Sequence, residues 1–99
     1  MNNRDQRAES RTATTLEGVV HVDAATVACH VKDISPHGAK ITGASPLAVG
    51  AHVTLSLDPF GSVKGEVMWD RDNASGIKFN DRAESIEQIL LGLASYAMV

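Results

Sequence analysis

Hydrophobic and polar residues alternate with a period of two from about residue 14 to residue 80. Such alternation is typical of β-strands that bury one face. It predicts six strands, and turn residues at 36–38 and 58–61 separate some of them. The alternating runs cover residues 19–22, 27–32, 39–42, 52–57, 63–70 and 77–79.

The run at 63–70 is predicted to be the longest strand. Trp69 continues its apolar side, so the pattern predicts a core residue there, with a place in a surface site as the alternative. A turn through Asp72, Asn73 and Ser75 is expected to lead into the last strand. Residues 43–50, which begin and end with glycine, are predicted to form a loop.

After Asn80 the apolar residues recur at helical spacing, which predicts a C-terminal helix at about 82–97. Asp81 and Glu84 resemble a capping box at its start. Gly92 inside this helix costs roughly 1 kcal/mol relative to alanine, so packing must hold the last turns.

Six short strands cannot all expose their edges in a soluble protein, so closure into a small barrel is the economical arrangement. The expected fold class is therefore all-β with one C-terminal helix, which lies against the barrel or covers one end. Residues 13–99 are predicted to form this single domain. Residues 1–12 have no apolar periodicity and hold three arginines against two acidic residues, which predicts a flexible N-terminal arm. The alternation does not determine the strand order.

The composition limits the possible functions. Ninety-nine residues with 43% apolar content support one modest core and a shallow surface site. Nine basic against twelve acidic residues give a net charge of −3, which disfavours broad DNA or RNA binding, so an anionic ligand needs a local basic cluster. The single cysteine, Cys29, is expected to be a small buried hydrophobe on a strand.

The chain shows no membrane or export signal. Residues 1–10 are polar, and the longest apolar segment, residues 89–99, is far shorter than the roughly 20 residues of a spanning helix. We therefore expect a cytoplasmic protein that does not insert into a membrane.

The motifs of common enzymes are absent: no phosphate-binding glycine loop, paired CxxC, HExxH or nucleophile elbow is found. The four histidines lack the close spacing of metal ligands; they are His21, His30, His37 and His52. We therefore predict no catalytic residue, no metal and no cofactor.

Two groups of residues remain as candidates for ligand binding. Arg7 and Arg11 lie four residues apart, and planar, permanently charged guanidinium groups can grip a phosphate or the O6/N7 edge of guanine. Asp33 and Ser35 are predicted to project side by side from a strand end. Gly38 then allows close approach of the backbone to a neighbour or a ligand. Taken alone, the arginine pair also fits a solvated charged tail, and the group at residues 33–38 also fits an ordinary strand end with turn residues.

Taken together, the RxxxR motif at residues 7–11 and the DxSxxG motif at residues 33–38 resemble the signature of the PilZ domain family. The resemblance extends over nearly the whole chain, since residues 67–69, residues 76–79 and the closing helix are similar to the usual end of that domain.

The resemblance implies a six-stranded antiparallel PilZ-type β-barrel that binds the bacterial second messenger cyclic di-GMP without catalysing a reaction. It implies that five residues contact the nucleotide: Arg7, Arg11, Asp33, Ser35 and Gly38. It further implies a receptor or adaptor that signals to an unidentified protein partner, for example in the regulation of motility or biofilms.

Three further residues are candidates for the same site. Gln6 precedes the first motif arginine, where the family varies between one and two nucleotides per protomer. His37 stands where such domains often have a smaller residue, so its imidazole either narrows the approach or adds a stacking surface. Trp69 is the third.

Three alternative functions stay open. A PilZ-like adaptor that binds a protein but no nucleotide comes first, with Leu91, Tyr96 and Met98 of the helix as its candidate surface. A single-strand nucleic-acid binder has the wrong net charge and only four aromatic residues for stacking. An enzyme is the least favoured class.

Overall fold

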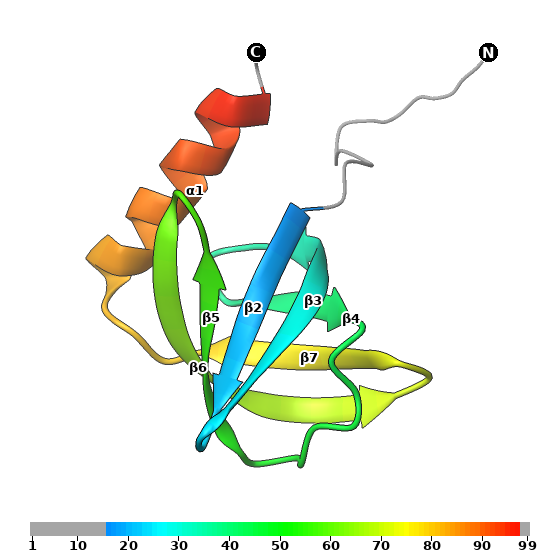
Figure 1. Ribbon diagram of the computed structural model, residues 1–99. Coiled ribbons are helices and arrows are strands. Elements are labelled where there is room, and N and C mark those ends of the chain that lie inside the picture. The colour runs from blue at the N-terminus through cyan, green and yellow to red at the C-terminus, as the bar shows by residue number, and fades with distance from the viewer. Residues whose placement is uncertain (1–15, 98–99) are drawn as a thin grey trace, which may run out of the picture.

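The structure is a computed structural model that describes residues 16–97, with side chains to residue 95. These residues form six strands and one helix (Figure 1). In chain order the elements are β2 (Leu16–Val22), β3 (Ala25–Ile34), β4 (Gly38–Thr42), β5 (His52–Leu57), β6 (Gly61–Arg71), β7 (Ala74–Phe79) and α1 (Ala83–Ala97).

The six strands close into a barrel in the order β2-β3-β4-β7-β6-β5, and every neighbouring pair is antiparallel. The predicted fold class is confirmed, and β6 is the longest strand, as the alternation indicated. Each strand directs alternate residues inward, so both edges of the sheet and its apolar face are removed from water.

The core lies inside this barrel. Its fully buried side chains include Val20, Ile41, Leu55, Leu57, Val63 and Val67. Cys29 is 3% exposed and belongs to the same cluster, which confirms its expected role as a buried hydrophobe. Desolvation by burial raises the pKa of its thiol to about 11.

Helix α1 packs against β6 along the outside of the barrel (Figure 1). Ile89 is the helical residue buried in the core, at 2% exposure. Gly92 faces Phe60 in the β5–β6 turn, and a Cβ atom at residue 92 would lie 2.7 Å from Cδ1 of Phe60. This close approach explains why the helix contains a glycine despite its low helix propensity.

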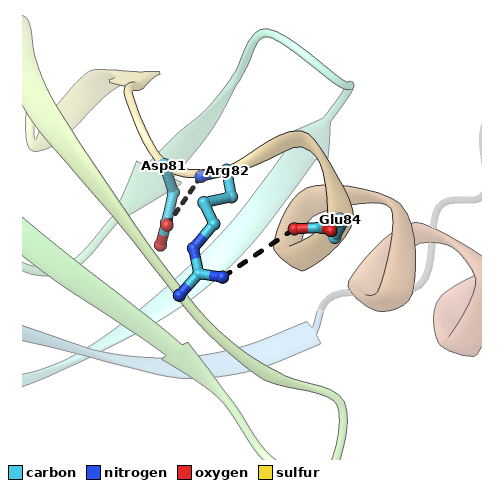
Figure 2. Close-up of polar contacts among 3 residues, drawn as sticks. All are labelled: Asp81, Arg82 and Glu84. Atoms are coloured by element: carbon cyan, nitrogen blue, oxygen red, sulfur yellow. Dashed lines mark hydrogen bonds and ion pairs between the residues drawn. The ribbon is translucent and has the colours of Figure 1, made fainter.

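The start of α1 differs from the predicted capping box (Figure 2). The Oδ1 atom of Asp81 accepts a hydrogen bond from the backbone N–H of Arg82 at 2.7 Å, and Oδ2 accepts one from the N–H of Lys64 in β6 at 3.0 Å. Glu84 instead lies 3.9 Å from the guanidinium of Arg82. Asp81 therefore ties the helix start to the barrel, and these hydrogen bonds lower the pKa of its carboxyl group.

Two register shifts interrupt the regular alternation, one in β3 between Val31 and Asp33 and one in β6 between Val67 and Trp69. An extra residue in one strand exchanges the inward and outward faces of all residues that follow it. Trp69 is therefore half-buried outside the core cluster, and its prediction as a core residue is wrong.

The β6–β7 turn is also shorter than predicted. It consists of Asp72 and Asn73, whose φ angles of 55° and 62° match a tight two-residue hairpin turn. Ser75 belongs to β7 and is 1% exposed, so its assignment to the turn is wrong.

The carboxylate of Asp70 fastens the loop between β4 and β5 to the barrel. Its Oδ2 atom accepts hydrogen bonds from Ser75 Oγ at 2.6 Å, Ser45 Oγ at 2.9 Å and the backbone N–H of Leu47 at 3.0 Å. The hydrogen bond from Ser75 is the largest cause that lowers the pKa of Asp70. The loop is thus held against β6 beside the second register shift.

Candidate functional site

A shallow depression of about 310 Å³ lies on the outer face of the barrel, where β3, β4, β7 and β6 run side by side. Five residues singled out from the sequence line it: Asp33, Ser35, His37, Gly38 and Trp69. They come from segments more than 30 residues apart, and closure of the barrel brings them together.

The two register shifts place Asp33 and Trp69 on the same outward face of the barrel. After the shift in β3, Asp33 lies opposite Lys40 of β4 rather than continuing the inward side of Cys29 and Val31. After the shift in β6, Trp69 lies opposite Gly76 of β7. Since Lys40 itself pairs with Gly76, an outward row runs across four strands. In order, this row is Asp33, Lys40, Gly76 and Trp69.

Ser35 lies in the turn just after β3, so it does not continue the strand from Asp33 as predicted. Its backbone N–H donates to the carbonyl of Gly38 at 2.9 Å, and its Oγ accepts from the N–H of His37 at 3.2 Å. The hydroxyl also lies 3.5 Å from the carbonyl oxygen of Gly38. These contacts hold the β3–β4 turn in shape, and Ser35 still lines the depression beside Asp33.

Gly38 and Gly76 form the floor of the depression because neither position has room for a side chain. A Cβ atom at Gly38 would overlap the carbonyl oxygen of Ile77, and one at Gly76 would overlap Nε1 of Trp69. Gly38 is therefore required for the close pairing of β4 with β7, in addition to any contact with a ligand.

Trp69 provides a flat aromatic wall at the β6 side of the depression. Its indole covers Gly76, and the guanidinium carbon of Arg71 lies 5.4 Å from the ring centroid. Met68, at the register shift, is 48% exposed and lines the same wall. An aromatic ring with polarisable neighbours is a surface on which a planar base can stack.

The sequence patterns did not single out Lys40, Lys78, Met68 or Gly76, all of which line the depression. The outward positions of Lys40, Met68 and Lys78 in alternating runs were visible, but that signal is common to every solvated strand residue. Gly76 lay outside these runs. Only the pairing of β4 with β7 brings the two lysines to the same place as Asp33.

Three predicted site residues, Gln6, Arg7 and Arg11, lie outside the described residues. The described chain begins at Leu16, which pairs with Val31. From there β3 runs on toward Asp33, past the start of β2. Leu16, at the start of β2, therefore lies beside the part of β3 that leads into the depression.

Residues 16–97 contain no cluster of three or more histidine, cysteine or acidic side chains that could hold a metal ion. Nε2 of His21 lies 3.0 Å from Ser56 Oγ at the surface. In the same residues, no helix has the length and hydropathy that a membrane span requires.

Comparisons with known proteins agree with this architecture. The sequence model of the PilZ domain matches residues 5–94. No curated protein sequence matches significantly.

Two solved structures resemble the fold. The PilZ domain of CeSA from a cellulose-synthesizing bacterium has a TM-score of 0.65 at 15% identity, over 84% of this chain and 96% of that one. The PlzA protein of Borreliella burgdorferi, solved in complex with c-di-GMP, has a TM-score of 0.58 at 19% identity and is matched over 75% of this chain. This chain covers 31% of the PlzA chain. Because the family model extends over most of the sequence, the chain belongs to the PilZ domain family.

Proposed function

We propose that this protein is a non-enzymatic receptor for cyclic di-GMP that binds the nucleotide in the depression between β3 and β6. One observation carries the proposal: residues of the DxSxxG motif and Trp69 line a single depression, and the start of β2 lies beside the part of β3 that leads into it. The complex of PlzA with c-di-GMP shows that a protein of related fold binds this ligand.

The chemistry of the depression suits a guanine nucleotide. The exposed carboxylate of Asp33 can accept hydrogen bonds from guanine N1 and N2. The hydroxyl of Ser35 can exchange its long contact with the Gly38 carbonyl for a bond to the ligand. Trp69 offers an aromatic face to a purine ring.

The motif arginines are close enough in sequence to reach this site. Arg11 precedes Leu16 by five residues, a span of at most about 17 Å, and Arg7 precedes it by nine residues, or about 30 Å. In the proposed mechanism the two guanidinium groups grip phosphate and guanine O6/N7 from outside, while Asp33 holds the opposite guanine edge. Binding then orders residues 1–12 over the barrel and changes the surface that a protein partner contacts.

Calorimetric titration with cyclic di-GMP tests the proposal. Wild-type protein is expected to bind, and Arg11→Ala is expected to bind roughly ten- to a hundredfold more weakly, since one charge-assisted contact is lost. Arg82→Ala is the matched control, because Arg82 is 81% exposed at the start of α1. Equal affinities of wild type and Arg11→Ala would contradict the proposed role of the arm.

A second candidate function is a PilZ adaptor that binds a protein partner and no nucleotide. It is favoured by Leu91, a large apolar side chain of α1 that is 69% exposed. The side chains of Tyr96 and Met98, which were predicted for the same surface, lie outside the described part of the structure. The same titration separates the two functions: absence of heat and of amide NMR shifts with cyclic di-GMP, in a folded protein, favours the adaptor. We further propose that either form acts in the cytoplasm.

A further inference from the structure

Strands β4 and β7 present two lysines and two glycines at four neighbouring outward positions. Gly38 lies opposite Lys78, and Lys40 lies opposite Gly76. Between β4 and β7, each lysine therefore has a glycine directly opposite it, and the two lysines lie diagonally across these four positions. On its other side each lysine lies opposite a carboxylate, Asp33 for Lys40 and Glu66 of β6 for Lys78. All four residues line the depression.

Neither glycine contributes a side chain between the two lysines, and the indole of Trp69 covers Gly76. Diagonal neighbours in an antiparallel pair lie roughly 7–8 Å apart, and lysine has a flexible four-carbon stem, so both ammonium groups can approach one anion. Lys40 and Lys78 are both exposed, and no carboxylate of residues 16–97 forms an ion pair with either. The two ammonium groups are thus available to a ligand.

The charge of the depression differs from that of the whole protein. The chain has a net charge of −3, yet the lining of the depression holds two lysines against the single carboxylate of Asp33. Glu66, directly opposite Lys78 on β6, lies next to this lining but is not part of it. His37 is the other titratable group at its rim. A local positive excess in an acidic protein favours an anion at this place over other parts of the surface.

The aromatic ring of Trp69 beside the lysines indicates which kind of anion fits the depression. Lys40 and Trp69 belong to the same outward row and are separated by the single residue Gly76, whose space the indole fills. A ligand that lies across the row meets an ammonium group at one point and an aromatic ring at the next. Nucleotides combine a phosphate with a planar base in this way.

We infer that Lys40 and Lys78 form a two-ammonium clamp that holds a phosphate group of the nucleotide on the barrel side of the depression. The inference rests on the proposed function, because it assigns two further binding residues to the same site. The clamp contacts the phosphate from the barrel, independently of the N-terminal arm. A protein with both arm arginines replaced therefore retains weak binding that depends on these lysines.

The double variant Lys40→Gln/Lys78→Gln tests the clamp, with cyclic di-GMP as the calorimetric probe at two ionic strengths. Lys64→Gln/Arg82→Gln is the matched control, because it also removes two positive charges, but at exposed positions outside the depression. Circular dichroism and thermal unfolding establish that both variants keep the fold.

The clamp predicts that the Lys40/Lys78 variant binds at least about tenfold more weakly and with a smaller dependence on ionic strength, since two charge contacts are removed. The control is expected to stay within about twofold of wild type, because exposed charges away from the ligand are screened. Wild-type affinity of the Lys40/Lys78 variant, or an equal loss in both double variants, would overturn the clamp and leave the proposed function standing. Absence of binding by the wild-type protein would overturn both.

Discussion

The indole of Trp69 lies across Gly76 of the neighbouring strand, in the space that any side chain at residue 76 would occupy. The contact exists because the register shift in β6 turns Trp69 outward. It keeps Gly76 buried on the outside of the barrel and sets the aromatic wall of the depression. Covering a strand glycine with a cross-strand aromatic ring is a known way to stabilise a sheet.

Gly76→Ala is expected to displace the indole and to lower the free energy of unfolding by about 1–3 kcal/mol, as overpacking does elsewhere. Trp69 is the single tryptophan of the sequence, so its fluorescence emission reports the displacement directly. Gly50→Ala is the control: its Cβ atom meets nothing within 4 Å, but its φ of +92° makes the substitution strained. Both variants should lose stability in urea unfolding, and only Gly76→Ala should shift the emission of the native state. An unshifted emission would contradict the contact.

Trp69 should also report ligand binding. If a guanine ring stacks on the indole or displaces Arg71 from it, addition of cyclic di-GMP will quench or shift the native emission. The titration curve should give the same dissociation constant as calorimetry. Calorimetric binding with no change in tryptophan emission would place the nucleotide away from this wall.

Asp33→Asn should weaken nucleotide binding roughly ten- to a hundredfold, because the amide replaces one acceptor oxygen by a donor that faces guanine N1 or N2. Asp23→Asn is the matched control, since Asp23 is an exposed turn residue whose positive φ asparagine tolerates. Neither change should alter the thermal unfolding temperature substantially, because both carboxylates are exposed. Equal nucleotide affinities of the two variants would remove Asp33 from the site.

The stability of the barrel should depend on pH through Asp70. Hydrogen bonds, that from Ser75 first, lower the pKa of Asp70 below its ordinary 3.8, so the folded state favours the ionised carboxylate. The resulting stabilisation is fully present above the ordinary pKa and is lost as the pH falls through 3.8 toward the lower pKa of the folded state.

Urea unfolding of wild type and Asp70→Asn between pH 7 and pH 3 measures this contribution. We expect Asp70→Asn to be less stable at neutral pH and the difference between the two proteins to shrink below about pH 4, where the carboxylate of the unfolded chain takes up its proton. A difference that stayed constant across this range would show that the hydrogen bonds of Asp70 do not depend on its charge.

Cys29 should be inert in the native protein. Its thiol is 3% exposed, and burial raises its pKa to about 11, whereas thiol reagents attack through the thiolate. At pH 8, labelling by an aromatic disulfide reagent should be slow in buffer and fast in urea, with a rate that follows the fraction of unfolded protein. Rapid stoichiometric labelling without urea would mean that this part of the barrel opens readily.

The alternation of polar and apolar residues was sufficient to predict six strands, the helix and the buried role of Cys29, because these depend on which face of an element avoids water. The motif at residues 33–38 could likewise be recognised from its letters. Barrel closure followed from the number of short strands, whose edges have to be covered. Strand order and the two register shifts could not be predicted, since pairing joins residues far apart in the chain and periodicity does not reveal an inserted residue.

The difference between what the sequence predicted and what the tertiary structure decided is clearest at the depression. By its sequence alone, Trp69 continues the buried side of a strand, and Lys40 and Lys78 are ordinary solvated positions. In the barrel, the shift in β6 turns the indole outward over Gly76, and the pairing of β4 with β7 sets both lysines around the same glycines. The local pattern thus determined most of the residues that avoid water, because burial follows the period of each strand. Hydrogen bonds between strands distant in the chain decided where the register shifts and which residues meet at the depression.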